Sequence, residues 1–381
     1  MYWAKWGHDV TFLTNAPNFP KGKVFDGYEN RWYQVEMMDG IRVVRVKSFM
    51  APNRGIVLRL LDFISFMLTS MIAGMFQKRP DVVTATSPQF FAGLSGAYLS
   101  LWHRRPFVLE VGDLWPATII GIGLMKRNLG LRMVEKVELA MYRRARGIVA
   151  LSNLIKRDLV ERGVPDAKVS VATNGVDLHR YGKRPKDDEL VAKYGLAGKF
   201  VAAYIGTHGM SHALERIIEA AELLRGNDDV RIMFVGSGAA REGIMKQAEE
   251  LGLHNVLFID EQPKESIARY WSLCDVAIVH LRNSPVFATA IPSKIFEAMG
   301  MGLPMIIAAP DGDAKEIVAK ENAGIVLPAE DPRGLADAIL RMKTDDELRN
   351  RLATNSYGAA SSYTREEQAR KVLAVYEAAL R

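Results

Sequence analysis

Short apolar runs that alternate with helical stretches recur along the whole chain, and this feature constrains the fold most. Each run ends in a polar or Gly-containing loop, as in DVVTATSP (81–88), KFVAAYIGTHG (199–209) and VRIMFVGSG (230–238). Strands of four to six residues that alternate with helices indicate βαβ units and a parallel sheet. The sequence therefore predicts an α/β protein with two doubly wound halves.

The pattern breaks once and then restarts. Residues 179–198 are polar and poorly periodic, which is typical of a linker, so we expect the halves to divide near residue 180. The start, MYWAKWGHDVTFLTN, reads as the last turn of a helix, a stop at Gly7 and a strand over 9–13. The strand and Gly-rich turn with which such a domain begins are not visible here, so either the true start lies upstream or the first half lacks them. Further strands are expected at 40–49, 106–111, 147–152, 169–177, 255–260, 275–281, 305–309 and 323–328, and helices at 62–77, 128–146, 212–225, 241–251, 264–273 and 332–343.

Charge is unevenly distributed. Residues 1–180 hold 25 Lys and Arg against 15 Asp and Glu, whereas residues 181–381 hold 25 against 29, for a net charge of +6. A basic half favours an anionic partner, unless it is only a solvated basic face. No zinc-finger spacing or aromatic-interleaved basic motif indicates nucleic acid. An anionic membrane surface or a phosphorylated substrate fits better.

The longest uncharged apolar segment is FISFMLTSMIAGMF (63–76). Its length is too short to span a bilayer, so we expect a helix in the core or at a membrane interface. The single cysteine, Cys274, lies in an apolar run and reads as a core residue. No internal disulfide is possible, which fits a reducing compartment.

Four loops of the second half should converge, because ligands of open parallel sheets bind outside the carboxyl ends of the strands. They are Gly206-Thr207-His208-Gly209, Gly236-Ser237-Gly238, the loop after Ile259, and the loop before Pro292. Glycines let the backbone approach a ligand, and free N–H groups at a helix start attract phosphate. A short Gly loop alone is a weak signal, since such loops are common in α/β proteins.

The stretch ATAIPSKIFEAMGMGLPMII (288–307) is more informative. Pro292 suits the first helical position, and Gly300, Gly302 and Pro304 suit the end of the helix. We expect the N–H groups of Ser293, Lys294 and Ile295 to lack partners. Lys294 adds a cation where the helix dipole disfavours one, so a bound anion would explain it. Glu297 shares its face and could accept hydrogen bonds from a ribose diol; a surface Lys–Glu pair is the alternative.

With these motifs the chain resembles a retaining glycosyltransferase of family 4, in the branch of bacterial O-antigen and capsule L-fucosamine transferases. The resemblance spans nearly the whole chain, through SP (87–88), EVGDLWP (110–116), NGVD (174–177), YIG (204–206), VGSG (235–238), FID (258–260) and IPSKIFEAMGMGLP (291–304). It implies the GT-B fold, in which two Rossmann-like domains face each other across a cleft. The domains would be 1–180 on the acceptor side, completed by a crossover helix at 364–381, and 181–363 on the nucleotide-sugar side.

The resemblance also implies roles for residues. Lys294 would hold the donor diphosphate together with the start of its helix, which follows Thr289, Ala290, Ile291, Pro292 and Ser293. Glu297 would hold the ribose. Gly236, Ser237, Gly238 and Ile259 would frame the base, and Gly206, Thr207 and His208 would lie beside the phosphates. On the acceptor side the matching residues are Ser87, Glu110, Asp113, Trp115 and Asn174, with Asp113 in a supporting catalytic role.

Three positions depart from the family pattern. Thr289 stands where many members have a Glu that contacts the donor sugar, although the fucosamine-transferase branch has a similar residue there. His208 and His212 stand where many members have Arg and Lys. Arg282 is a candidate second charge for the diphosphate, or a solvated loop arginine.

The implied reaction moves a sugar, which we expect to be N-acetylated and UDP-linked, to a glycan or polyprenyl-diphosphate-linked acceptor in cell-surface polysaccharide synthesis. We expect no cofactor and no metal, because there is no Asp-x-Asp and no His/Cys cluster with ligand spacing. The expected location is cytoplasmic, with peripheral contact at the inner face of the plasma membrane. The alternatives are a UDP-N-acetylglucosamine 2-epimerase-like enzyme and a non-catalytic nucleotide-binding subunit of a membrane complex. A dehydrogenase is disfavoured, because no Gly-x-Gly-x-x-Gly follows the first visible strand of either half.

Overall fold

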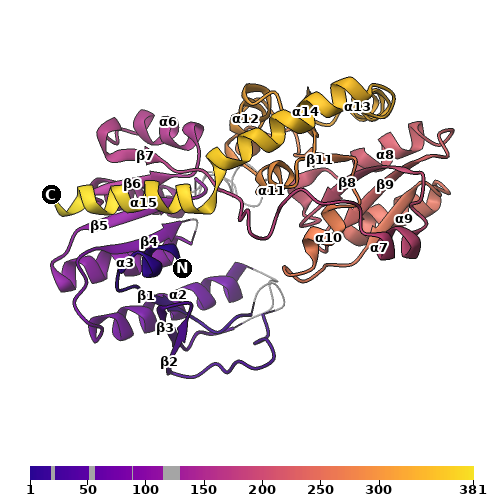
Figure 1. Cartoon of the computed structure of the whole chain (residues 1–381). Helices are drawn as coiled ribbons and strands as arrows, with labels where there is room; N and C mark the ends of the chain where they lie inside the picture. Colours follow the sequence, from indigo (N-terminus) through magenta and orange to yellow (C-terminus); the bar gives the residue numbers. More distant parts are fainter. Residues whose placement is uncertain (19–21, 51–55, 88, 115–128) are drawn as a thin grey trace. The chain divides into compact units, whose positions relative to one another are not determined.

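The computed structural model describes residues 1–18, 22–50, 56–87, 89–114 and 129–381 (Figure 1). The chain divides into two compact units. The N-terminal unit comprises Met1–Ala172 and Ala369–Arg381, and the C-terminal unit comprises Thr173–Gln368. The last helix, α15 (Arg365–Leu380), leaves the C-terminal unit and ends in the N-terminal one. The expected divisions lay at 180/181 and 363/364.

The described residues of the N-terminal unit form two sheets. One has three strands in the order β1-β3-β2, with β1 (Thr11–Thr14) parallel and β2 (Tyr33–Met38) antiparallel to β3 (Ile41–Val46). The other is fully parallel, in the order β4 (Val83–Ser87), β5 (Phe107–Val111), β6 (Gly147–Ala150) and β7 (Val169–Val171). The helices are α1 (Tyr2–Lys5), α2 (Ile56–Met75), α3 (Phe90–His103), α5 (Leu129–Arg144), α6 (Asn153–Glu161) and the 3₁₀ turn η1 (Asp166–Lys168).

Both faces of the four-stranded sheet are covered. On one face Leu109 and Ile148 belong to a core with residues of α3, α5 and α6. On the other face Val108 and Val149 pack against Val375 of α15. Because side chains of a strand alternate between faces, this assigns neighbouring residues of β5 to opposite sides of the sheet.

The C-terminal unit has one six-stranded parallel sheet in the order β10-β9-β8-β11-β12-β13. The strands are β8 (Phe200–Ile205), β9 (Val230–Val235), β10 (Val256–Ile259), β11 (Val276–His280), β12 (Met305–Ala308) and β13 (Gly324–Leu327). This is the strand order of the Rossmann fold. All strands are parallel, but the order in which the chain adds them across the sheet reverses between β8 and β11. The expected ligand position is therefore outside the carboxyl ends of these two strands.

Helices surround this sheet in the order expected of βαβ units (Figure 1). They are α7 (Asp188–Tyr194), α8 (Glu215–Leu223), α9 (Arg241–Glu250), α10 (Ile267–Trp271), α11 (Lys294–Met301), α12 (Asp313–Lys320), α13 (Pro332–Thr344) and α14 (Asp346–Ala359), with 3₁₀ turns η2 (Met210–His212), η3 (Pro285–Thr289) and η4 (Ala360–Tyr363). The central strands are buried on both faces: every residue of β8 is buried. This burial explains their continuous apolar runs. Cys274 is buried in the same core, as expected.

The two-unit α/β architecture predicted from the sequence is confirmed. Five of the described helices and strands were not predicted: β2, α3, α6, α7 and α12. Of these, α7 lies within 179–198, which was predicted to be a linker without regular structure. The helix predicted at 62–77 begins earlier than expected, because α2 extends over Ile56–Met75. Its stretch Val57–Met75, with mean hydropathy 1.6, is long and apolar enough by length and composition to cross a membrane. Only 17% of its most apolar window is buried, so it is not a core helix.

Candidate functional site

The start of α11 differs from the sequence prediction. The helix begins at Lys294, and Pro292 precedes it instead of occupying its first position. The N–H of Ile295 donates to the carbonyl of Pro292 at 3.1 Å, because the first turn is tightened. Three N–H groups were predicted to lack partners. Of these, the N–H groups of Ser293 and Lys294 have no backbone acceptor within the described ranges. Gly302 ends the helix in the left-handed conformation, as predicted.

Lys294 is buried, with only 6% of its surface exposed. Its Nζ lies 3.3 Å from the ring centroid of Tyr204 on β8, and it has no hydrogen-bond partner within the described ranges. Burial lowers the pKa of the amine well below its usual value, and the carboxylate of Glu297 only partly offsets this. A buried amine without a partner is costly, so its position favours a role with a ligand.

The two Gly loops meet at the same place. A side-chain carbon on Gly206 would lie 3.4 Å from Nζ of Lys294, so the lysine reaches the end of β8. The loops after β8 and β9 are joined by the N–H of His208, which donates to the carbonyl of Ser237 at 2.8 Å. The N–H of Gly236 donates to the carbonyl of Ile259 at 3.1 Å, which adds the end of β10. Three of the four predicted loops are therefore joined to one another by hydrogen bonds.

Histidines surround this point. His208 is fully buried, and among the residues that the structure describes neither ring nitrogen has a partner within normal hydrogen-bonding distance. Burial, helped by the charges of Arg241 and Lys294, lowers the pKa of His208 to about 4, and burial lowers the pKa of His212 to about 4 as well. His212 and His280 each use Nδ1 to contact the other's carbonyl, at 3.1 and 2.8 Å. All three imidazole rings are therefore neutral near pH 7. Each can form a hydrogen bond without carrying a positive charge.

Glu297 lies one turn after Lys294 and is half-buried. Burial raises the pKa of its carboxyl group, while the charge of Lys294 and hydrogen bonding to Tyr181 moderate the rise. The segment before α11 is ordered by its own contacts: the hydroxyl of Thr289 donates to the carbonyl of Val286 at 3.1 Å, and Ile291 is buried. Ala290 is in the extended conformation, whereas Ser293 already has the helical conformation and caps the start of α11.

Arg282 is engaged within the protein. Its guanidinium forms an ion pair with Glu215 at 2.7 Å and donates to the carbonyl of Met210 at 2.9 Å. It therefore ties the loop after β11 to η2, and a second charge for a diphosphate would require this pair to open. Ser237 is likewise engaged, since its hydroxyl donates to Glu261 at 2.6 Å, while the carbonyl of Thr207 accepts from Tyr204 at 2.8 Å.

Two of the predicted acceptor-side residues, Ser87 and Glu110, face opposite sides of the four-stranded sheet. Ser87 of β4 faces the side of the sheet that carries α3 and α5, whereas Glu110 of β5 faces α15. Glu110 accepts hydrogen bonds from Tyr376 of α15 and from Thr84, and burial raises the pKa of its carboxyl group. Period-two alternation separates the two side chains, and Glu110 anchors α15.

The other predicted acceptor-side residues are Asp113, Trp115 and Asn174. Asp113 lies in the bend after β5, and burial raises the pKa of its carboxyl group. The N–H of Gly112 donates to the carbonyl of Ser87 at 3.1 Å, which places this bend beside the end of β4. Trp115 lies outside the described residues. Asn174 belongs to the C-terminal unit, where neighbouring Val176 pairs with Thr364.

Within the described ranges, no three His, Cys, Asp or Glu side chains are placed to hold a metal ion. The ligand chemistry at the start of α11 is that of an anion: one buried amine, free N–H groups and Gly-containing loops at the reversal point of a parallel sheet.

Two family models divide the sequence almost completely between them. The model for glycosyl transferases group 1 matches residues 186–359, and the model for Glycosyltransferase Family 4 matches residues 1–180. The chain belongs to these glycosyltransferases. This confirms the family suggested by the sequence motifs.

Among its curated relatives, this glycosyltransferase is 24% identical over 311 residues to WcaI of Escherichia coli, a colanic acid biosynthesis glycosyl transferase. The match covers 80% of this chain and 76% of WcaI. It is 24% identical over 209 residues to TuaH of Bacillus subtilis, a teichuronic acid biosynthesis glycosyltransferase, covering 54% of this chain and 51% of TuaH.

Among solved structures, the fold matches HepE of Anabaena, determined in complex with UDP and glucose, with a TM-score of 0.72 and 18% identity. The match covers 96% of this chain and 100% of HepE. At this identity the similarity shows the fold, and the predicted GT-B class is confirmed.

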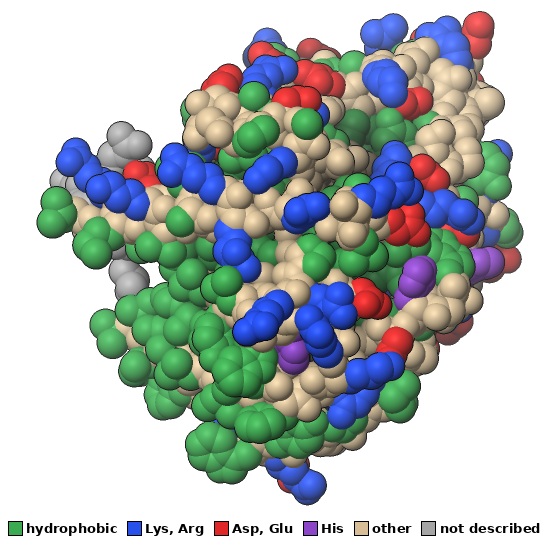
Figure 2. Space-filling view, turned by 90° about the vertical axis from the view of Figure 1, so that its left-hand side faces the viewer, with side chains coloured by type: hydrophobic (Ala, Val, Ile, Leu, Met, Phe, Trp, Pro, Cys, Tyr) green, Lys and Arg blue, Asp and Glu red, His purple; other side chains and the backbone are tan. Residues whose placement is uncertain are grey.

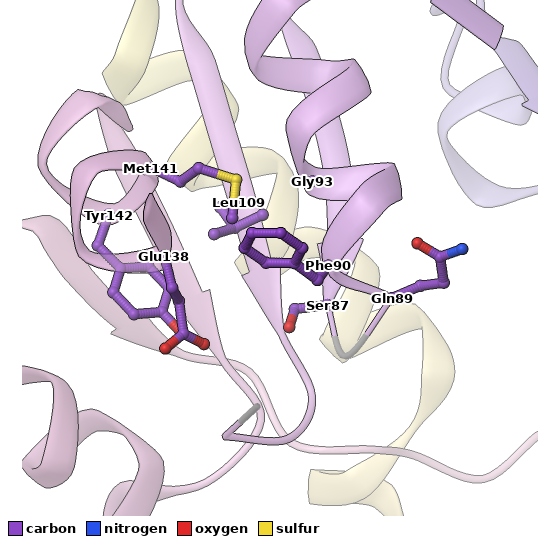
Figure 3. A pocket seen from close by; sticks show the side chains of 8 residues that line it. All are labelled: Ser87, Gln89, Phe90, Gly93, Leu109, Glu138, Met141 and Tyr142. Atoms are coloured by element: carbon purple, nitrogen blue, oxygen red, sulfur yellow. The ribbon is translucent and has the colours of Figure 1, made fainter. Parts of the chain in front are cut away.

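The sequence analysis missed one polar group of the N-terminal unit, shown in Figure 3. Glu138 of α5 is buried and lines a small pocket with Ser87, Gln89, Phe90, Leu109 and Tyr142. The hydroxyl of Tyr142 donates to Glu138 at 2.7 Å, and the second carboxyl oxygen lies 3.6 Å from Arg162. Burial raises the pKa of Glu138 to about 7. Glu138 and Tyr142 are one turn apart in a charged helix, which is also the spacing of ordinary surface pairs. The sequence alone therefore did not show that this carboxyl group is buried.

Proposed function

We propose that this glycosyltransferase moves a sugar from a UDP-linked donor to a glycan or polyprenyl-diphosphate-linked acceptor, with retention of anomeric configuration, in cell-surface polysaccharide synthesis. The names of WcaI and TuaH support the polysaccharide role, and the bound UDP and glucose of HepE support the donor. An N-acetylated hexose is the transferred sugar in this proposal. The place of action is the cytoplasmic side of the plasma membrane.

The proposal depends most on Lys294. Its buried Nζ, without a hydrogen-bond partner within the described ranges, lies beside Gly206 and the free N–H groups at the start of α11. A diphosphate bound there would receive a charge-assisted hydrogen bond from the amine and further bonds from the N–H groups of Ser293 and Lys294. Glu297, one turn further, would accept the ribose hydroxyls. Gly236 to Gly238 and the backbone at Ile259 would border the base.

These groups would also promote the reaction. Negative charge develops on the diphosphate as the bond to the sugar breaks, and fixed N–H dipoles with one cation stabilise it in a site shielded from water. The diphosphate oxygen then takes the proton of the acceptor hydroxyl, so no strong protein base is required. Asp113, at the carboxyl end of β5, would support the acceptor, and neither metal nor cofactor takes part.

The test combines binding and turnover. UDP should raise the Tm of the wild-type protein more than GDP, ADP or dTDP does, because ligands of the folded state stabilise it. In Lys294→Ala the UDP-induced shift should shrink and kcat should fall on the order of 10²-fold or more. Lys246→Ala, which removes an exposed lysine of α9, is the matched control and should change neither.

Turnover should persist in EDTA. Restoration of lost activity by Mg²⁺ or Mn²⁺ would contradict the metal-independent part of the proposal. An unchanged UDP shift together with near-normal turnover in Lys294→Ala would contradict the diphosphate assignment.

A product assay separates the two alternatives that the sequence leaves open. An epimerase converts the donor without any acceptor, whereas a non-catalytic subunit neither transfers nor hydrolyses the donor sugar. Acceptor-dependent release of UDP by the isolated chain is the result that supports the transferase.

A further inference from the structure

Helix α2 has an apolar face that no described residue of the N-terminal unit covers. Val57, Leu61, Leu68, Ile72 and Phe76 are 70%, 47%, 51%, 56% and 81% exposed. Their spacings of mostly four residues place them along one side of the helix and its end. Leu58 and Leu60 add 42% and 43% exposure at the first turn. An apolar stripe of this length on a water-soluble surface marks an interaction site.

The opposite side of α2 is fixed in the fold. The hydroxyls of Ser70 and Ser95 of α3 are 2.8 Å apart, and Gly74 allows Leu99 to approach closely. The helix also connects β3 to β4, which belong to the same unit. To cross a bilayer, α2 would have to leave α3 and this unit. Its apolar face is therefore suited to lie on a bilayer and not to span it.

The exposed apolar surface continues from α2 onto the end of α3. Nε2 of His103 lies 3.0 Å from the carbonyl of Gly74, which brings the two helix ends together. There Leu101 and Trp102 are each 56% exposed. Figure 2 shows hydrophobic side chains gathered over the lower part of the face it displays, next to a group of Lys and Arg side chains. We name the surface formed by Val57, Leu61, Leu68, Ile72, Phe76, Leu101 and Trp102 the α2–α3 surface.

Cations lie at both ends of the α2–α3 surface. Arg59 is exposed on the first turns of α2, and Lys78, Arg79 and Arg104 are exposed where α2 and α3 end. Two acidic groups are close: Asp9 pairs with Lys78 at 2.8 Å, and Asp62 is half-buried on α2. Long basic side chains beside an apolar face can reach anionic headgroups while the face enters the acyl boundary, and Trp is enriched at that boundary.

We propose that the α2–α3 surface docks this glycosyltransferase on an anionic lipid bilayer. The charge at the edges favours an anionic bilayer over an apolar protein groove, and a 20-residue helix, about 30 Å long, offers the extended contact that a planar surface requires. The proposal deepens the proposed function by naming a membrane as the place where a lipid-linked acceptor is met. The observations that support it come from the N-terminal unit alone. The docking proposal therefore does not depend on the assignment of the donor site to the start of α11.

The test is flotation of the full chain with two kinds of liposome, phosphatidylcholine alone and phosphatidylcholine with phosphatidylglycerol. The wild-type protein should float with the anionic liposomes and much less with the neutral ones. The triple variant Leu61→Glu/Leu68→Glu/Ile72→Glu should bind the anionic liposomes at least tenfold more weakly, because carboxylates resist entry into the acyl boundary. Arg79→Glu/Arg104→Glu should bind the anionic liposomes roughly thirtyfold more weakly, the equivalent of about 1 kcal/mol for each of the two cations removed, and so lose most of the preference for anionic lipid.

The matched control is Leu223→Glu on α8, whose leucine is 52% exposed in the C-terminal unit. This variant should float like the wild type. The UDP-induced Tm shift should be the same in all these variants, which shows that each is folded and separates failure of docking from failure of the proposed function. Equal flotation of the triple variant, or no flotation of the wild type, would overturn the proposal. A concentration-dependent dimer that the triple variant abolishes would assign the α2–α3 surface to a second copy instead.

Discussion

At the scale of single residues, Lys294 carries a cost in the absence of ligand. Its amine is buried without a hydrogen-bond partner within the described ranges, and its pKa is lowered well below 10.5 by burial. Between this lowered pKa and pH 10.5, the amine binds a proton in the unfolded chain but not in the folded chain. The folded state therefore gains stability as the pH rises through this window. Residues that serve a ligand commonly destabilise the empty site in this way.

We expect Lys294→Met to raise the Tm of the ligand-free protein at pH 7, because an apolar side chain of similar length avoids burying the amine. A gain of about 1–3 kcal/mol in the free energy of unfolding corresponds to a rise in Tm of a few degrees for a unit of this size. The gain should shrink toward pH 10, and the UDP-induced shift should be lost. Differential scanning fluorimetry with and without UDP measures both. A lower Tm in the variant would mean that the lysine is paired in the native protein.

Glu138 provides a separate prediction in the N-terminal unit. Its pKa is raised from 4.5 to about 7 by burial, so the folded state binds the extra proton in this window. Stability is therefore lost as pH rises from 4.5 to about 7, by an amount on the order of 3 kcal/mol. Glu138→Gln keeps an acceptor for Tyr142 and removes the titration.

The Tm of Glu138→Gln relative to the wild type should consequently increase between pH 5 and pH 8. Thermal unfolding across this range is the measurement. Glu161→Gln, at the exposed end of α6, is the control and should give parallel curves. A constant difference between Glu138→Gln and the wild type would show that Glu138 keeps its charge through its contact with Arg162.

At the scale of elements, the site depends on how closely two loops approach. Gly238 has φ +149°, and a side-chain carbon there would lie 2.5 Å from the carbonyl oxygen of His208. Backbone atoms cannot move aside as a flexible side chain can, so the loop after β9 must retain glycine. The same close approach places Gly236 against the backbone of Gly206.

We expect Gly238→Ala to lower the free energy of unfolding by about 2 kcal/mol or more and to reduce the UDP-induced Tm shift. Urea unfolding and the nucleotide thermal shift measure these effects. Gly243→Ala is the matched control, because nothing lies within 4 Å of its added carbon and it occupies the interior of α9. The control should be stabilised slightly. Equal stability of the two variants would contradict the close approach.

At the scale of the whole molecule, local patterns predicted most elements. The expected strands at 81–88, 106–111 and 305–309 correspond to β4, β5 and β12. β5 and β12 were recognisable because a parallel strand buried on both faces is a continuous apolar run. β2 was missed because it is an antiparallel edge strand whose apolar side chains are exposed, so no buried apolar face marks it in the sequence. The donor loops could be placed together, since the carboxyl ends of parallel strands share one edge.

The sequence by itself determined the alternation of strands and helices, the two halves and the loop that carries Lys294, because hydrophobic period and turn chemistry are local properties. Only the tertiary structure decided that Lys294 lies buried against Tyr204, that Glu110 faces α15, and that one face of α2 is uncovered. These facts depend on which distant residues pack around a side chain, and such packing, with the burial and charge it brings, is set when the whole chain folds.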